Sequence, residues 1–437
     1  MLLQFSIKNF RTFKEKASLS FVASNYDKGT RELDNIFHDT QFNLRLLKSA
    51  VVYGANASGK SKLFDALMFM KHFVINSSDE SLVIKKMYLE PFRLNSESAN
   101  SPSEFEVVFT HKNVMYRYGF EINKDKIISE WLYYKPKTKE IELFYRDGNK
   151  FETHDRNFSK GKLVINEGLV RENALLLFVA SQFNDSTSMA VIDWFQELNI
   201  ISGLEEGEFK NNTIGKIKNN KEKTKIIEFL KVADLGIQDI QYEKLSLGIS
   251  DDLNEFYDQI LDIDPEIFSD VSTIHNIYDS NKKNIGRVKF SVKSDESSGT
   301  KKFLYLSGTI IDVLKTGGIL IADELDSKLH PNLVCKIVSL FNSKLNNKNA
   351  QLIFNTQNTN LLSSGLFRRD QIWFTEKNKL GEAKLYSLAD FKSDEVRKTE
   401  SFEENYIRGK YGAVPFLGFF DNLNNILLPY ENEGQKD

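Results

Sequence analysis

Hydrophobic positions along the chain change their spacing several times, and these changes divide the chain into segments. Apolar and polar residues alternate in runs within residues 1–53 and 104–146, which is typical of strands. Between 173 and 263 the apolar residues recur at helical spacing, and alternation returns at 286–293. The pattern predicts four segments: an N-terminal lobe that includes an antiparallel β subdomain (1–172), an inserted helical subdomain (173–284), a C-terminal lobe (285–400), and a terminal segment with a tail (401–437).

One glycine-rich stretch, GANASGKS at residues 54–61, lies between a strand-like run and a helical run. It matches GxxxxGK[ST], the pattern of a phosphate-binding loop whose backbone N–H groups curl around the phosphates at a helix N-terminus. Lys60 is expected to reach the β- and γ-phosphates, and the Ser61 hydroxyl to ligate Mg²⁺. The alternative is a glycine-rich turn that binds nothing. The expected nucleotide contacts are Gly54, Ala55, Asn56, Ala57, Ser58, Gly59, Lys60 and Ser61.

A second motif, GGILIADELDSKLHP, begins at Gly317. Its apolar residues 319–322 predict a buried parallel strand that delivers Asp323 and Glu324 to the carboxyl edge of a sheet, where ligands bind. Asp323 would hold Mg²⁺, directly or through water, and Glu324 would orient and deprotonate the attacking water. Alternatively, the Asp-Glu pair only caps the following helix.

The spacing of the two motifs selects a class of ATPase. More than 250 residues separate Lys60 from Asp323, which is longer than in ring-forming AAA+ motors or small GTPases and fits an ABC-type head with inserted subdomains. Such a head carries a signature loop before the second carboxylate, and Ser298 and Gly299 open an amphipathic helix at that place. Hydroxyls, a glycine and a helix N-terminus suit a second anion site. The simpler interpretation is an ordinary helix N-cap.

Composition and charge indicate which partners and which cellular compartment suit this chemistry. The formal charge of −3 and the pI of about 6.2 indicate that any nucleic-acid contact is local. The lysine-rich run at 210–225 is interpreted as a solvated face, with a DNA-facing patch as the alternative. The single cysteine, Cys335, excludes a disulfide framework and fits a small buried residue in a reducing compartment. No signal sequence or membrane-spanning run is evident, so we expect a cytoplasmic protein without a membrane partner.

Seven stretches together carry a resemblance to a known family. They are NFRTF at 9–13, GANASGKS at 54–61, ESSGTKKFL at 296–304, LIADELDSKLHP at 320–331, LIFNTQNTNLL at 352–362, RRDQIWFTEK at 368–377 and ENYIRGKYGAVP at 404–415. Over nearly its whole length the chain resembles the AAA-type branch of the ABC/SMC-like ATPases of bacterial abortive-infection and anti-phage systems. It is similar to the ATPase members of the RloA and AbiL gene pairs, and more distantly to the PARIS ATPase. The resemblance implies an α/β ABC/SMC-like P-loop NTPase head with an antiparallel β subdomain and an inserted helical subdomain.

The family mechanism implies a dimer in which two heads enclose two ATP molecules with Mg²⁺. Lys60 and Ser61 of one subunit would face Ser298 and Gly299 of the other, so we expect a homodimer or a higher oligomer. Asp326 resembles the D-loop residue that couples the two sites.

Two further positions are assigned through the resemblance. Arg11 resembles a residue of the N-terminal loop that approaches the nucleotide, although a surface arginine after the first strand describes it equally well. Gln357 stands where the family usually has a switch histidine that contacts the γ-phosphate and the attacking water. Glutamine can still donate and accept hydrogen bonds there, but it carries no positive charge. Slow hydrolysis is one consequence, and a merely tolerated substitution is the alternative.

Two functions from different classes follow. In the first, the protein binds and hydrolyses ATP as a sensor that controls a separate effector, a TOPRIM-type nuclease encoded nearby, with DNA or a phage protein as candidate trigger. In the second, it is an SMC- or repair-like ATPase that clamps DNA. The second function usually needs long heptad arms, and residues 190–263 hold no sustained a/d pattern, which favours the first. The effector is assigned to another chain because only 80 residues follow Gln357, and no DxD pair for a metal lies among them.

Overall fold

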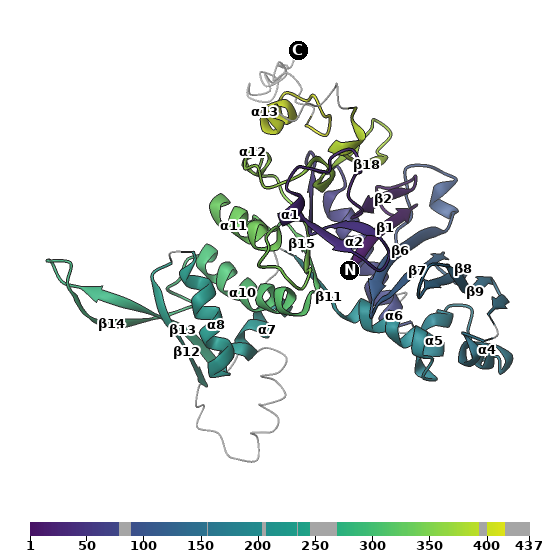
Figure 1. Cartoon of the computed structure of the whole chain (residues 1–437), viewed down its shortest axis with the longest axis horizontal. Coiled ribbons are helices and arrows are strands. Elements are labelled where there is room, and N and C mark those ends of the chain that lie inside the picture. The colour runs from purple at the N-terminus through teal and green to yellow at the C-terminus, as the bar shows by residue number, and fades with distance from the viewer. Residues whose placement is uncertain are drawn as a thin grey trace, which may run out of the picture.

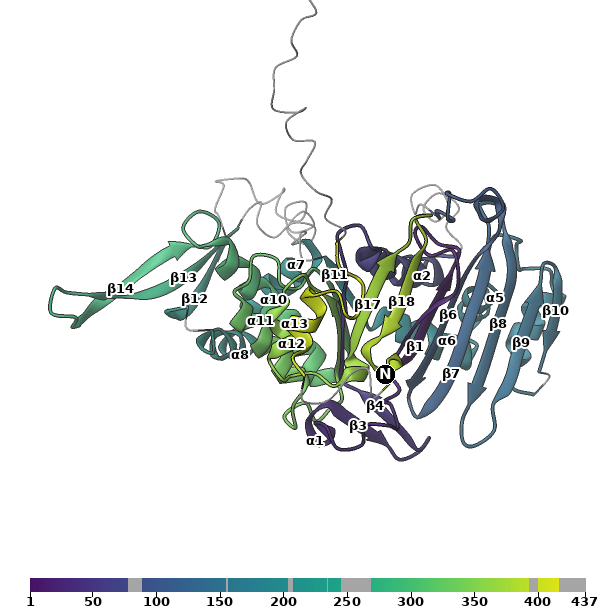
Figure 2. The same cartoon turned by 90° about the horizontal axis from the view of Figure 1, so that it is seen from above.

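The computed structural model describes residues 1–77, 89–154, 156–202, 207–233, 235–244, 269–392 and 400–415. These residues form a mainly parallel core sheet, an antiparallel sheet, and an outlying body of helices with a three-stranded sheet. The core sheet lies between the antiparallel sheet and the outlying body (Figures 1 and 2).

The core sheet has six strands in the order β11-β15-β16-β5-β17-β18. All neighbouring pairs are parallel except β17 and β18. The strands are β5 Ser49–Tyr53, β11 Leu198–Ser202, β15 Ile319–Asp323, β16 Gln351–Asn355, β17 Ile372–Lys377 and β18 Ala383–Ser387. Every residue of β5 and β16 is buried, as expected for parallel strands covered on both faces. The carboxyl ends of β15, β16 and β5 therefore lie next to one another at one edge of the sheet.

The antiparallel sheet has seven strands in the order β10-β9-β8-β7-β6-β1-β2. They are β1 Leu2–Lys8, β2 Ala17–Ser20, β6 Ser103–His111, β7 Val114–Ile122, β8 Ile127–Lys135, β9 Ile141–Asp147 and β10 Lys150–Thr153. Alternate residues of β6 are buried from Ser103 to Phe109, which is the period of a half-buried strand. Phe105 of this strand packs on Phe69 of α2 (Lys60–Ile75), with ring centroids 4.9 Å apart. Helix α2 also contacts β11 and β15, so it lies between the two sheets (Figure 2).

Three helices that follow β10 cover the face of the antiparallel sheet on which α2 also packs. They are α4 Ser159–Asn166, α5 Leu176–Gln182 and α6 Ser186–Gln196. Trp194 of α6 stacks on Phe109 of β6, with ring centroids 3.9 Å apart. This packing joins the helices to the hydrophobic core that α2 shares with the sheet.

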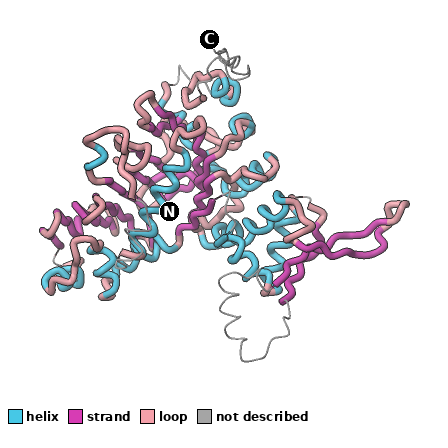
Figure 3. Tube along the Cα trace, turned by 180° about the vertical axis from the view of Figure 1, so that it is seen from behind, coloured by secondary structure: helices cyan, strands magenta, loops and turns pink. Residues whose placement is uncertain are grey.

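The outlying body combines helices with a small sheet. Its elements are α7 Gly207–Ile217, α8 Asn220–Lys231, β12 Ile237–Lys244, β13 Ser269–Tyr278, β14 Asn284–Ser291 and α10 Ser298–Thr316. The three helices pack on one another, and β13 and β14 project from them as a hairpin (Figures 1 and 3). Residues 173–284 are thus helical only in part, because β11 joins the core sheet and β12 and β13 form the small one. The helix expected at 251–260 lies outside the described residues.

The remaining elements of the described residues are mostly short. They are α1 Glu32–Asn35, β3 Ile36–Asp39, β4 Leu44–Leu47, η1 Ser98–Asn100, α11 Pro331–Phe341, α12 Asn360–Ser363, η3 Arg369–Gln371, η4 Leu388–Asp390 and α13 Phe402–Ile407. The architecture confirms the predicted α/β P-loop fold with an antiparallel β subdomain and an inserted, partly helical subdomain. Over the described ranges, no helix combines the length and apolar character needed to cross a membrane.

Candidate nucleotide site

The glycine-rich loop at 54–61 connects the carboxyl end of β5 to the first turn of α2. A Cβ at Gly54 would collide with the backbone oxygen of Thr375 on β17. Gly59 has a φ of 116°, and a Cβ there would lie 3.0 Å from the hydroxyl oxygen of Thr12. Both positions therefore require glycine. The loop ends at the N-terminus of a 16-residue helix, where free N–H groups and the helix dipole favour an anion.

One side of the phosphate loop contacts β17, and the other side is exposed. The Ser58 and Thr375 hydroxyls are 2.7 Å apart, and the Thr375 hydroxyl also donates to the carbonyl of Tyr53 at 3.3 Å. Ala57 adopts a positive φ of 61°, a conformation that turns backbone N–H groups toward one concavity. Asn56 and Ala57 are exposed at the mouth of this concavity. The loop geometry fits a bound phosphate chain.

Lys60 lies inside the loop and close to the second motif. Its ammonium donates to the carbonyl oxygens of Gly54 at 2.6 Å and Ala55 at 3.1 Å. Burial lowers the pKa of Lys60, and the carboxylates of Glu324 and Asp323 oppose that shift. Burial disfavours the charged form of a lysine that has no anionic partner, so an anionic phosphate is a suitable partner for Lys60.

Asp323 and Glu324 end β15 at the same edge, and a residue of the next strand joins them. The Asn355 amide nitrogen donates to Asp323 Oδ1, and Asn355 Oδ1 accepts from the backbone N–H of Glu324 at 2.6 Å. Asn355 is fully buried at the end of β16. Glu324 has a φ of 52°, so the chain turns sharply directly after Asp323. Asn355 thus fixes one oxygen of Asp323, and the other oxygen makes no hydrogen bond to a described residue.

The two proposed magnesium ligands come from different motifs. Ser61 is half-buried at the start of α2, and its hydroxyl has no hydrogen-bond partner among the described side chains. Mg²⁺ in nucleotide sites usually takes one or two protein oxygens and completes its shell with phosphate and water. A hydroxyl of Ser61 and the free oxygen of Asp323 fit that donor set.

Gln357 follows β16 by two residues, in a loop that lies against the end of β5. The Thr356 N–H donates to the carbonyl of Val52 at 3.3 Å, and the Tyr53 hydroxyl donates to the carbonyl of Asn358 at 3.2 Å. The Gln357 side chain is exposed. Because β16 lies between β15 and β5, Gln357 emerges between the carboxylates and the phosphate loop.

The segment expected as a signature begins α10 and packs on the loop that follows β15. The Ser297 hydroxyl accepts from the N–H of Thr300 at 3.1 Å, so the helix does have an N-cap. Ser298 is exposed, whereas a Cβ at Gly299 would lie 2.7 Å from the carbonyl oxygen of Lys328. Within the described part of one chain, no hydrogen bond connects Ser298 to the phosphate loop.

Lys302 is a buried residue of α10 that the sequence motifs did not reveal. Its ammonium donates to the carbonyl oxygens of Glu324 at 3.2 Å and Ser327 at 2.7 Å. Asp326 lies in the same loop, and its carboxylate acts to raise the pKa of Lys60. Lys302 therefore ties the signature helix to the turn that carries Glu324 and Asp326.

Arg11 lies beside α2 rather than free in the site. Its guanidinium is paired with Asp65 of α2, and its backbone N–H donates to the carbonyl of Glu90 at 2.6 Å. Its side chain is 24% exposed, and Asp65 also accepts from Lys62 at 2.9 Å. A contact between Arg11 and nucleotide would have to compete with the Asp65 carboxylate.

The C-terminal motif at 404–415 packs directly behind the phosphate loop. The ring of Tyr406 lies 5.6 Å from that of Tyr53 and 5.4 Å from that of Phe374. Burial raises the pKa of Tyr406 to about 12, although a hydrogen bond with the backbone of Gly54 acts to lower it. Glu403 accepts from the Thr359 hydroxyl at 2.9 Å, which joins the same helix to the Gln357 loop. The sequence pattern predicted no structural role for these residues.

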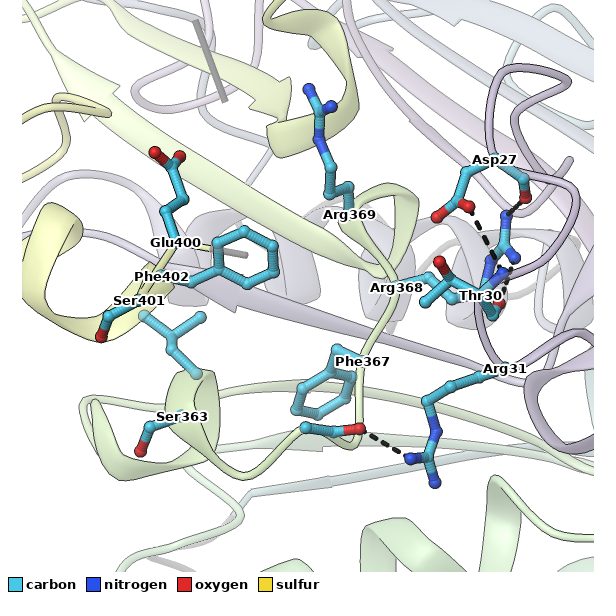
Figure 4. Close-up of a pocket in the computed structure, with 12 residues that line it drawn as sticks. Asp27, Thr30, Arg31, Ser363, Phe367, Arg368, Arg369, Glu400, Ser401 and Phe402 are labelled. Atoms are coloured by element: carbon cyan, nitrogen blue, oxygen red, sulfur yellow. Dashed lines mark hydrogen bonds between the residues drawn. The ribbon is translucent and has the colours of Figure 1, made fainter. Parts of the chain in front are cut away.

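A cavity of about 440 Å³ lies away from the phosphate loop, between residues 27–31, 362–369 and 400–402 (Figure 4). The Arg31 guanidinium donates to the carbonyl of Gly365 at 2.7 Å. Arg368 donates to the carbonyl of Asp27 at 2.6 Å and to its neighbour Asp370 at 2.8 Å. These guanidinium groups are already engaged by protein oxygens, so the cavity is not built as a second anion site.

Comparisons with solved structures find SMC head domains. A SmcHead bound to the C-terminal winged helix domain of ScpA is 15% identical, with a TM-score of 0.44 over 88% of this chain and 97% of that chain. The SMC head domain of Thermotoga maritima is 15% identical, with a TM-score of 0.41 over 88% of this chain and 98% of that chain. The fold assignment rests on the sheet orders described above and not on these similarities.

No curated protein sequence matches the chain. A family model described as "AAA domain, putative AbiEii toxin, Type IV TA system" matches residues 49–363, which include the phosphate loop, both carboxylates and the Gln357 loop. Because this match spans more than half of the 437 residues, the chain belongs to that AAA-domain family.

Proposed function

We propose that this chain is a Mg²⁺-dependent ATPase that acts as the sensor subunit of a bacterial anti-phage system and controls a separate effector, a TOPRIM-type nuclease. The observation that carries the ATPase part is the placement of the loop that ends at Lys60 and of Asp323 and Glu324 at the same carboxyl edge of the core sheet, after β5 and β15. The defence part is supported by the family description, which names an AbiEii toxin and a toxin–antitoxin system, and by the resemblance of the motifs to defence ATPases.

In the proposed site, Lys60 would exchange the carbonyl oxygens of Gly54 and Ala55 for oxygens of the β- and γ-phosphates. Ser61 and Asp323 would hold Mg²⁺, which neutralises charge that develops on the phosphate oxygens. Glu324 would accept a proton from the attacking water.

Three further groups would position the reaction. Asn355 would keep Asp323 and the backbone of Glu324 in register, as its two hydrogen bonds do in this structure. Gln357 would orient the attacking water through its amide. Ser298 and Gly299 of a second copy would cover the γ-phosphate and complete the site, and this part of the proposal rests on family resemblance.

Phage challenge of cells that express this chain together with a neighbouring effector gene tests the defence role. Lys60→Ala and Glu324→Gln should each abolish protection at unchanged protein levels, because both remove a group that the ATP cycle needs. Lys124 is exposed in the turn between β7 and β8, so Lys124→Ala serves as control and should keep protection. Protection by the Lys60→Ala protein at the parental level would refute an ATP-driven sensor.

A further inference from the structure

The hairpin of β13 and β14 extends beyond the sheet that supports it. Strand β12 pairs with β13 only as far as His275, so the distal residues 276–287 form a two-stranded ribbon (Figures 1 and 3). The side chains of Ile277, Tyr278 and Ile285 are 38%, 59% and 63% exposed. A two-stranded ribbon is at best marginally stable in water without a packed face. Such an unsupported arm therefore suggests a binding partner.

The ribbon is strongly basic in a protein with a formal charge of −3. Lys282, Lys283 and Arg287 are exposed, and none of them makes an ion pair with a described residue. Asp279 is the only acidic residue between 276 and 287, and its carboxylate accepts backbone N–H groups of Asn281 and Lys283 at 2.9 and 2.8 Å. The three cations are therefore available to an anionic partner.

Strand register gathers hydrogen-bonding side chains on one face of the ribbon. Asn276 is paired with Arg287, and Tyr278 with Asn284, with a shift of register between Ile277 and Tyr278. The Asn276 amide donates to the Tyr278 hydroxyl at 3.4 Å, so these two side chains lie on one face. Residues that lie directly opposite each other in an antiparallel pair point to the same face. A guanidinium, two amides and a phenol therefore share a face near the lysines of the turn, which is the mixture that binds phosphates, sugars and base edges.

We propose that this ribbon binds duplex DNA by entering the major groove, with Lys282, Lys283 and Arg287 on the phosphates. The major groove of B-form DNA admits a two-stranded ribbon, whereas the narrow major groove of A-form RNA does not. Three exposed cations without acidic partners among the described residues, beside a single carboxylate that is already bonded to backbone N–H groups, favour the regularly spaced phosphates of DNA over a protein partner. The regulatory part of this inference rests on the proposed ATPase function, because DNA would then be the cue that the sensor detects.

The base of the ribbon is attached to the signature segment. Glu296, which precedes the N-cap Ser297 of α10, accepts from the Thr273 hydroxyl and lies 2.8 Å from His275 Nε2. Thr273 and His275 belong to β13 below the ribbon. A displacement of the ribbon would therefore reach Ser298 through Glu296, and from there the nucleotide of a neighbouring copy.

The binding step is tested without ATP, by fluorescence anisotropy of a labelled duplex DNA with the full chain. The triple variant Lys282→Gln, Lys283→Gln, Arg287→Gln should bind on the order of 100-fold more weakly at about 0.1 M salt, with a log–log salt slope shallower by about 2 to 3. The matched control Lys124→Gln, Lys137→Gln, Lys139→Gln removes the same charge from exposed turns of the antiparallel sheet and should bind like the parent. Equal affinity of the parent and the ribbon variant for DNA would overturn the proposal. A parent protein that does not bind DNA would overturn it as well, and would assign the ribbon to a protein partner.

Coupling to the ATPase is tested separately. Duplex DNA should change the ATP turnover of the parent and of the control triple variant, but not that of the ribbon variant, whose basal turnover should be unchanged. Glu296→Gln should bind DNA like the parent and respond to it weakly. A Glu296→Gln protein that responds fully would refute this route, while a parent that binds DNA but never hydrolyses ATP would refute the ATPase assignment and leave the DNA site standing.

Discussion

The two carboxylates at the end of β15 depend on a residue of the neighbouring strand. Asn355 bonds both the Asp323 carboxylate and the backbone N–H of Glu324, and it is fully buried. Residues that orient metal ligands commonly change metal affinity or activity by about 10- to 100-fold when they are removed. The geometry of Asp323 is therefore expected to depend on Asn355.

Asn355→Ala should raise the Mg²⁺ concentration needed for half-maximal ATP turnover by about 10-fold or more. The physical reason is that Asp323 would lose the bond that fixes one of its oxygens. A titration of ATP turnover with Mg²⁺ measures the effect. Asn360 is exposed in the segment that follows β16, so Asn360→Ala serves as control. An unchanged Mg²⁺ dependence in Asn355→Ala would show that the amide does not position the metal ligand.

Gln357→His should raise the rate of a single turnover at saturating ATP. An imidazolium adds positive charge near the γ-phosphate, where the transition state gains negative charge, and a glutamine amide does not. Single-turnover kinetics separate the chemical step from product release. If the histidine variant is equally fast or slower, Gln357 is a neutral or already tuned replacement, and the protein is not slow because of it.

The sequence predicts site residues that stand in contiguous motifs, but not the residues that contact them across strands. Lys60, Asp323 and Glu324 were predicted because a phosphate loop and a buried strand have recognisable local patterns. Asn355 and Lys302 were missed because their roles depend on contacts with residues 31 and 25 positions away. The only available signal for Asn355 was its place at the end of an apolar strand next to the switch loop.

At the scale of secondary structure, the alternation in residues 104–146 predicted β6 to β9 well, since each strand has one buried face. The region 173–284 was harder to predict. Strand β11 occupies Leu198–Ser202 directly after helix α6 and pairs with β15, so its assignment depends on a strand 121 residues away (198 to 319). Local periodicity cannot show such a pairing.

Helix α13 is expected to stabilise the phosphate loop from behind. Tyr406→Ala should lower the free energy of unfolding by about 3 kcal/mol, because a large buried aromatic ring leaves a cavity between Tyr53 and Phe374. Tyr406→Phe should cost only about 1 kcal/mol, since it keeps the ring and loses the hydrogen bonds of the hydroxyl, among them the one to the Ala413 carbonyl. Chemical denaturation measures both variants.

The neighbouring Ile407 provides the control for this experiment. It is 61% exposed, so Ile407→Ala should change stability by no more than about 0.5 kcal/mol. A Tyr406→Ala protein as stable as Ile407→Ala would mean that α13 does not brace the loop.

At the scale of the whole molecule, the proposal places Ser298 of one copy in the nucleotide site of another. Ser298 is exposed, and in the described part of one chain it makes no hydrogen bond to the phosphate loop. Ser298→Trp should therefore abolish turnover without unfolding the protein, because the bulky ring would displace the contact that Ser298 makes with the γ-phosphate in the site of the second head.

Mixing Ser298→Trp with Lys60→Ala should restore part of the turnover, because a mixed dimer keeps one intact composite site. Native mass spectrometry would show whether mixed dimers form. Mixed dimers without recovered activity would mean that each subunit works alone.

ATP turnover by the purified parent and its Glu324→Gln variant tests the central claim most directly. The parent should hydrolyse ATP only with Mg²⁺, and Glu324→Gln should retain bound ATP while losing about 10²- to 10⁴-fold in rate, because the base that accepts the proton of the attacking water is gone. Lys60→Ala should instead lose ATP binding, which distinguishes a binding defect from a chemical one. Hydrolysis by Glu324→Gln at the parental rate would contradict the assignment of this edge of the core sheet as the active site.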